Sequence, residues 1–184
     1  MTKQKKAYLI HGTSTRDDDW FPWLEKAARP QIQVERLSLP TPFNPDPQQW
    51  QDACDSQIQP APALTIVAHS LGCVTALRYV ERHTELTGVR LLLVGAFAEK
   101  LPAYPELASF VQPALDCDKI QDRLAKATVI CAQNDPIAPY QDGVAVAHGI
   151  GAKLIVQNTG GHFLTSDGYR SFPLALKELR QLVQ

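Results

Sequence analysis

The 184-residue sequence has no long hydrophobic run and no excess of either charge. Its 18 basic and 19 acidic residues leave a formal net charge of -1 at pH 7, so neither nucleic acid nor an anionic membrane is expected as a partner. No segment approaches the roughly 20 apolar residues of a membrane span. The basic start of the chain precedes only a short apolar run, residues 7–10, whereas a signal peptide needs about 7 to 15 apolar residues. We therefore expect a cytoplasmic protein.

Cysteine is scarce and scattered. The sequence contains four cysteines, Cys54, Cys73, Cys117 and Cys131, and none of them forms a Cys-x-x-Cys pair. An even number would allow two disulfides, but the spacing indicates neither a disulfide framework nor a metal cage. Cys73 and Cys131 lie in apolar stretches, which favours buried free thiols.

Short β-branched apolar runs alternate with helical patterns along the chain. This alternation is typical of an α/β protein with a mostly parallel sheet and helices on both faces. The length suits one domain, spanning residues 1–184. We expect a sheet of six strands, or nearly so, at residues 7–10, 33–37, 64–68, 90–95, 128–132 and 153–156.

The segments between these runs include three helical stripes and two irregular stretches. The stripes begin near residues 20, 73 and 172, and the aspartates at 17–19 suit the N-terminus of the first helix. Residues 39–47 contain four prolines, which predicts a loop that either faces the substrate or covers the core. Residues 98–119 are irregular and follow a strand, where this architecture often carries a lid.

A serine stands between a strand-like run and a helix in residues 64–72, Leu-Thr-Ile-Val-Ala-His-Ser-Leu-Gly. Ser70 is flanked by Ala68 and Gly72, close to the Gly-x-Ser-x-Gly pattern of a nucleophile elbow, whose sharp turn requires small residues on both sides. Alanine at the first position is the smallest departure from that pattern. The helix N-terminus would favour negative charge developing near the serine. The alternative is that Ser70 only caps the helix.

A serine hydroxyl needs a base to take its proton and a third group to orient that base. In α/β-hydrolases the chain order is serine, acid, histidine. Asp135 follows one predicted strand and His162 follows the next, at the sheet edge where such folds place active sites. Each has a plain alternative, Asp135 as a turn residue before proline and His162 as a loop histidine. Together, in this order, they predict a triad with Ser70.

The oxyanion would need two backbone N–H donors. Leu71 follows the nucleophile and supplies the first, and the loop after the first strand supplies the second, from Thr13 with Ser14 in reserve. His11 is expected to shape this loop rather than act as a base. A metal site formed by His11, His69 and His162 is a minor alternative, because their neighbours form no recognisable ligand set. No cofactor is required.

Several aromatic residues are candidates for the substrate pocket. Trp20, Trp23, Phe43 and Tyr104 would form an apolar acyl site, and Trp20 and Phe43 are the residues we select, with His69 lining the pocket. The competing interpretation is that these aromatics belong to the core, which is their more common place.

These motifs together resemble a known family, the small α/β-hydrolases related to retinoblastoma-binding protein nine and their bacterial relatives. The similarity covers most of the chain and is carried by residues 10–13, 20–24, 39–42 with Trp50, 66–72, 134–136 with Pro139, and 160–162. It implies a compact hydrolase with little or no cap domain, and triad roles for Ser70, Asp135 and His162.

The sequence departs from the family at two places. Phe172-Pro173 replaces a tryptophan-proline pair, from which we expect a different pocket wall. The Leu-x-Cys-x-Glu motif of retinoblastoma binding is absent, because the corresponding segment Leu115-Asp-Cys-Asp-Lys119 ends in lysine. We therefore do not expect this protein to bind the retinoblastoma partner.

The sequence predicts a serine hydrolase of the carboxylesterase type that forms an acyl-enzyme on Ser70 from a small-molecule substrate. The alternative is a protein-binding module on a hydrolase scaffold with little or no turnover, because a fold and a motif do not prove activity. Thioesterase and peptidase activities, the natural substrate and the oligomeric state stay open.

Overall fold

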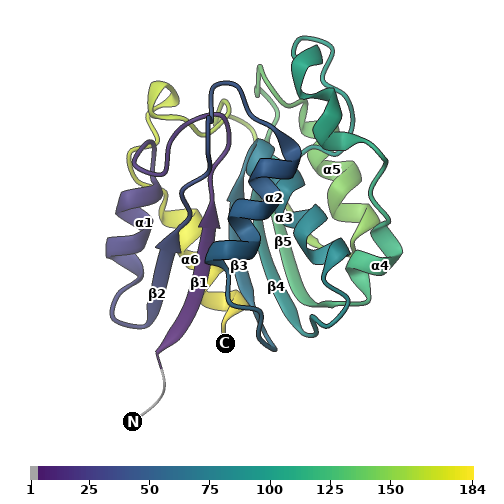
Figure 1. The fold of residues 1–184 in the computed structure, drawn as a ribbon. Helices are drawn as coiled ribbons and strands as arrows, with labels where there is room; N and C mark the ends of the chain where they lie inside the picture. The colour runs from purple at the N-terminus through teal and green to yellow at the C-terminus, as the bar shows by residue number, and fades with distance from the viewer. Residues whose placement is uncertain (1–3) are drawn as a thin grey trace.

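The strands of the computed structural model, which describes residues 4–184, form one parallel sheet in the order β2-β1-β3-β4-β5-β6. The first three residues of the basic start lie outside the described residues. The strand bounds are β1 Lys5–Ile10, β2 Ile32–Arg36, β3 Thr65–His69, β4 Val89–Val94, β5 Leu124–Ala132 and β6 Lys153–Gln157. All strands point the same way, so the loops after them meet at one edge of the sheet (Figure 1). The predicted α/β fold with six parallel strands is confirmed.

Helices cover both faces of this sheet. Helices α1 Phe21–Ala28 and α6 Pro173–Leu182 lie on one face, and α2 Pro47–Gln57, α3 Leu71–Arg82, α4 Cys117–Gln121 and α5 Tyr140–Gly149 lie on the other (Figure 1). Two short 3-10 helices, η1 Pro105–Val111 and η2 Thr165–Asp167, belong to the connecting segments. No helix of the described residues combines the length and apolar character that crossing a membrane requires.

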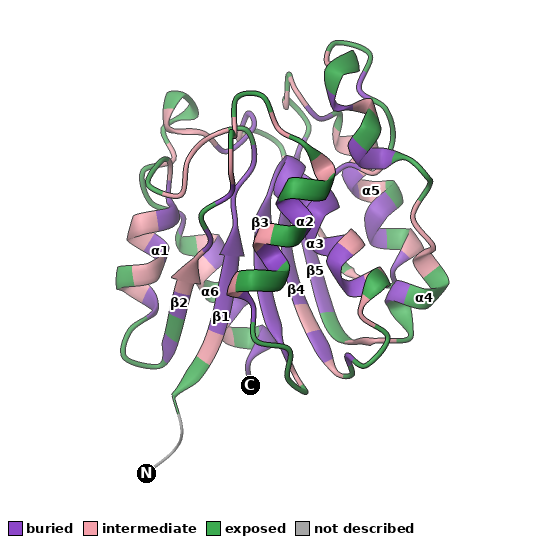
Figure 2. Ribbon diagram, in the orientation of Figure 1, coloured by how far each residue is buried: buried purple, intermediate pink, exposed green. Residues whose placement is uncertain are grey.

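Alternate residues of the strands pack into two separate cores. In β1, Ala7 and Leu9 pack with α1 and α6, whereas Tyr8 and Ile10 pack with α2 and α3. This period of two follows from the pleat of a strand, and both faces are apolar because both are covered. Figure 2 shows the result, with buried strands at the centre and exposed residues on the outer faces of the helices. The central strands are therefore a rigid base for the loops at the sheet edge.

Three expectations for the helices and strands need correction. The strand predicted at 128–132 begins earlier, at Leu124. The proline-rich loop ends one residue sooner, because Pro47 is the first residue of α2 and the carboxylate of Asp46 accepts a hydrogen bond from the Gln49 N–H. The three aspartates do not cap α1, whose N-terminal residue Trp20 makes no side-chain cap. Asp17 instead pairs with Arg36.

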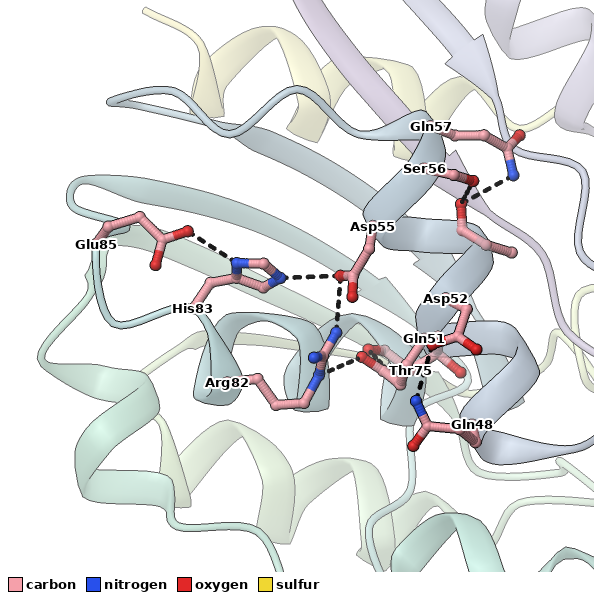
Figure 3. Close-up of polar contacts among 11 residues, drawn as sticks. Gln48, Gln51, Asp52, Asp55, Ser56, Gln57, Thr75, Arg82, His83 and Glu85 are labelled. Atoms are coloured by element: carbon pink, nitrogen blue, oxygen red, sulfur yellow. Dashed lines mark hydrogen bonds and ion pairs between the residues drawn. The ribbon is translucent and has the colours of Figure 1, made fainter.

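Polar contacts tie α2 to α3, the helix that follows Ser70 (Figure 3). The carboxylate of Asp55 accepts hydrogen bonds from Arg82 Nη2 at 2.7 Å and His83 Nε2 at 2.9 Å. Gln51 donates to the carbonyl of Thr75 at 3.0 Å and accepts from Arg82 Nε at 3.1 Å. These bonds orient the helix pair, although partly exposed ion pairs of this kind contribute only about 1 kcal/mol or less each.

Candidate active site

Ser70 lies at a sharp turn between β3 and α3. Its φ of 55° is a conformation that non-glycine residues rarely adopt, and its side chain makes no helix-capping hydrogen bond. The turn brings α3 hard against β1, because a Cβ added to Gly72 would lie 2.4 Å from the carbonyl oxygen of Ile10. The small residue predicted at this position is thus required by close backbone contact. The alternative that Ser70 is only a capping residue does not fit this geometry.

The side chains of Ser70, His162 and Asp135 form a continuous hydrogen-bonded chain. His162 Nε2 lies 2.7 Å from Ser70 Oγ, and His162 Nδ1 lies 2.7 Å from Asp135 Oδ2. Because a carboxylate only accepts hydrogen bonds, the proton of a neutral His162 sits on Nδ1, and Nε2 is free to accept from the serine hydroxyl. The side chains of His162 and Asp135 are 2% and 1% exposed, so water scarcely competes for these bonds.

Asp135 is itself held in place by the turn after β5. Its second oxygen, Oδ1, accepts hydrogen bonds from the N–H groups of Ile137 at 2.8 Å and Ala138 at 3.0 Å. These two donors fix the plane of the carboxylate, so that Oδ2 faces His162. The turn-forming role that we weighed as the alternative for Asp135 is compatible with its contact to His162, because the two roles use different carboxylate oxygens.

A cavity of about 500 Å³ opens onto Ser70 and His162. One wall is apolar and comes from the segment after β4 and the turn after Asp135. Its residues are Phe97, Leu101, Tyr104, Leu107 and Ile137. A second wall is mainly polar and comes from residues 13–19 and 164–170. Three of the apolar residues, Leu101, Tyr104 and Leu107, lie in the irregular segment 98–119, so this segment contributes to the cavity wall.

The comparison with protein-family models matches residues 7–181 to the family described as serine hydrolase. The chain belongs to the serine hydrolase family. This confirms the family resemblance that the sequence motifs indicated.

This serine hydrolase is similar in sequence to two curated relatives and in structure to one solved structure. It is 35% identical over 180 residues to the hydrolase YdeN of Bacillus subtilis (strain 168), covering 95% of this chain and 93% of that protein. It is 26% identical over 174 residues to the serine hydrolase RBBP9 of Rattus norvegicus, covering 91% of both chains. The crystal structure of the ydeN gene product from B. subtilis superposes with a TM-score of 0.90, at 32% identity, over 98% of this chain and 99% of that one. The protein is therefore a hydrolase with an α/β-hydrolase fold.

The selected pocket residues do not all lie in the cavity wall of this serine hydrolase. Trp20 is fully buried and packs edge-on against Phe21 and Phe172, so it belongs to the core. Phe43 is 78% exposed and lies outside the cavity lining. Phe172, where the family often has tryptophan, is likewise a core residue and does not alter the wall as we expected. Whether an aromatic residue faces core or pocket depends on tertiary packing, which the sequence pattern does not specify.

The loop after β1 passes close to the nucleophile at Gly12, and the next residue, Thr13, lines the cavity together with Ser70. A Cβ added to Gly12 would lie 2.8 Å from Ser70 Cβ and 3.3 Å from the Leu71 nitrogen, so the chain passes directly over the turn. His11 fixes this loop, because its Nδ1 lies 2.8 Å from the Gly12 carbonyl and its Nε2 accepts from the Leu39 N–H at 3.3 Å. Burial lowers the pKa of His11, which keeps the ring neutral. Its predicted role in shaping the loop agrees with these bonds.

Three further side chains hold the His162 loop. Asn134 Oδ1 accepts hydrogen bonds from two consecutive glycine N–H groups, at 2.9 and 3.0 Å. Asp167 Oδ2 accepts from the His162 N–H at 2.9 Å, and Asp19 Oδ1 accepts from the Thr165 N–H at 2.6 Å. Burial raises the pKa of Asp19. Asn134 belongs to the segment 134–136 that the sequence analysis singled out, although no role was predicted for it. Nothing in the sequence indicated the roles of Asp167 and Asp19, because their partners are set by tertiary structure.

The histidines do not assemble a metal site with their neighbours. Within residues 4–184, no group of three or more histidine, cysteine, aspartate or glutamate side chains is arranged to hold a metal ion. His11 and His69 each use a ring nitrogen on a backbone carbonyl instead.

Proposed function

We propose that this serine hydrolase cleaves esters of small acyl groups through an acyl-enzyme on Ser70. The observation that carries the proposal is the unbroken chain from Ser70 Oγ through His162 to Asp135, with both hydrogen bonds at 2.7 Å and the serine facing a cavity. The arrangement matches what a weak hydroxyl nucleophile needs, which is an adjacent base and a group that holds the base in one tautomer.

In the proposed reaction, the Ser70 hydroxyl attacks the ester carbonyl while His162 Nε2 takes its proton. The imidazolium, stabilised by Asp135, then gives that proton to the departing alcohol, and the acyl group stays on Ser70. Water attacks the acyl-enzyme, with the same histidine as base, and the released acid restores Ser70. The N–H groups of Thr13 and Leu71 are the proposed donors to the oxyanion, and each such donor typically contributes about 10²- to 10³-fold in rate.

The two walls of the cavity suggest how a substrate is oriented. The apolar wall from Phe97 to Ile137 suits the acyl chain, and the polar wall suits an alcohol leaving group. A volume of about 500 Å³ lies in the usual range for sites of small ligands. We therefore expect short or medium acyl chains. The four cysteines, all in the described residues, are free thiols, which suits the cytoplasmic location that we keep as a prediction.

Hydrolysis of p-nitrophenyl esters of increasing chain length tests this proposal. We expect turnover that falls with long chains and that Ser70→Ala abolishes. Leu107→Trp, which fills the apolar wall, should shift the preference to shorter chains, whereas Phe43→Ala, outside the cavity, should leave the preference unchanged. No ester hydrolysis by the folded protein would contradict the proposal and favour the protein-binding alternative. Hydrolysis of thioesters or peptides alone would replace the substrate class and keep the nucleophile.

A further inference from the structure

His69 is a buried histidine next to the nucleophile that the proposed reaction does not use. It is the last residue of β3 and only 1% exposed. Its ring lies among the rings of Trp20, Phe21 and His162, with centroid distances of 6.0, 5.6 and 5.1 Å. A polar ring in such a place needs a reason, because burying it without a hydrogen bond is costly.

The reason lies in the backbone of the catalytic loop. His69 Nε2 is 2.8 Å from the carbonyl oxygen of His162. A carbonyl oxygen only accepts, so Nε2 carries the proton, and a neutral ring then has no proton on Nδ1. Nδ1 has no hydrogen-bond partner among the described residues. Burial, and then the charge of His162, lower the pKa of His69 to about 3, so the ring stays a neutral donor across the working range of pH.

This bond completes a support that surrounds His162. The backbone N–H of His162 donates to Asp167 and the backbone carbonyl of His162 accepts from His69, while Nδ1 of the His162 ring contacts Asp135. The ring also rests on Gly95, where an added Cβ would lie 3.1 Å from Cε1. Of these supports, His69 is the one that comes from the strand leading directly into Ser70.

We propose that His69 is a positioning residue that ties the backbone of His162 to the strand carrying Ser70, so that nucleophile and base keep their distance throughout the reaction. The proposal rests on the proposed function of Ser70 and His162. The neutral state of the His69 ring is part of this role. The ring centroids of His69 and His162 are 5.1 Å apart, so a positive charge on His69 would disfavour the imidazolium that forms on His162. His69 also lines the cavity, as the sequence analysis expected, and the positioning role is additional to that place.

A matched pair of substitutions tests the hydrogen bond separately from the packing. Glutamine and methionine have unbranched side chains of similar length, but only glutamine ends in an N–H donor that can reach the His162 carbonyl. We expect His69→Met to lower kcat by about 10- to 100-fold with little change in KM, because small misplacements of catalytic groups cost about that much. His69→Gln should retain activity within about fivefold of the wild type, on the same reasoning.

Thermal unfolding of both variants controls for a loss of packing. Equal losses of kcat in two folded variants, or full activity in His69→Met, would overturn the proposal. A KM increase with unchanged kcat would also overturn it, because it would make His69 a binding residue.

A second measurement does not depend on turnover. In ¹⁵N-histidine NMR of the wild-type protein, His69 should show the tautomer protonated on Nε2 and no titration between about pH 5 and pH 9. A tautomer protonated on Nδ1, or a titration in that range, would refute the role of His69 even in an active enzyme. If the protein lacks hydrolase activity but shows this tautomer, the proposed function fails while the structural tie stands.

Discussion

Replacing Asp135 with asparagine should lower kcat by about three to four orders of magnitude while leaving the fold intact. Two backbone N–H groups donate to the Oδ1 position, so an asparagine must keep its oxygen there and present its NH₂ group to His162. That group donates to Nδ1 and forces the histidine proton onto Nε2. The ring would then donate to Ser70 rather than accept its proton.

The measurement is steady-state ester hydrolysis together with thermal unfolding. Asp52→Asn is a matched control, because Asp52 is an exposed residue on α2, and its activity should equal that of the wild type. Activity of Asp135→Asn within about tenfold of the wild type would mean that Asp135 does not set the tautomer of His162.

The second large effect is expected from Gly72→Ala. In an exposed helix this change would stabilise the protein by about 1 kcal/mol. Here the new Cβ would lie 2.4 and 2.5 Å from the carbonyl oxygens of Ile10 and His11, at the end of β1 and in the loop after it. Neither atom belongs to a flexible side chain, so the turn around Ser70 must distort. We expect a loss of about 3 kcal/mol or more in the free energy of unfolding.

Urea unfolding measures this loss, and Ala68→Gly is the matched control at the other small position of the motif. That change restores the strict glycine pattern and should cost only about 0.5 to 1 kcal/mol, from backbone entropy in a strand. If Gly72→Ala is as stable as the wild type, the close contact between α3 and β1 is not as the structure shows.

The strand pattern and the spacing around Ser70 were enough to predict the sheet and to select three side chains that meet in space. The strands can be recognised in the sequence as short apolar runs, because both faces of a covered parallel sheet are apolar. The chain order of serine, acid and histidine, with each residue placed just after a predicted strand, selected Asp135 and His162 as the partners of Ser70. Loops after parallel strands converge by geometry, so residues distant in sequence could be expected at one edge.

The parts that could not be predicted depend on tertiary contacts. The contact between Asp19 and Thr165 joins loops 146 positions apart, and no local pattern indicates it. Likewise, the aromatic character of Trp20, at the start of a helical stripe, and of Phe43, in the proline-rich loop, does not show which of them is buried or faces a cavity. The aromatic residues that do line the cavity, Phe97 and Tyr104, lie between β4 and η1, and their place there depends on how this segment packs.

Labelling with a fluorophosphonate probe, with the adduct located by mass spectrometry, shows whether Ser70 is an activated nucleophile. The probe reacts with a serine only when an adjacent base activates it. We expect one adduct, on Ser70, that is lost in Ser70→Ala and strongly reduced in Asp135→Asn. An adduct on another residue, or none on the folded wild-type protein, would contradict it.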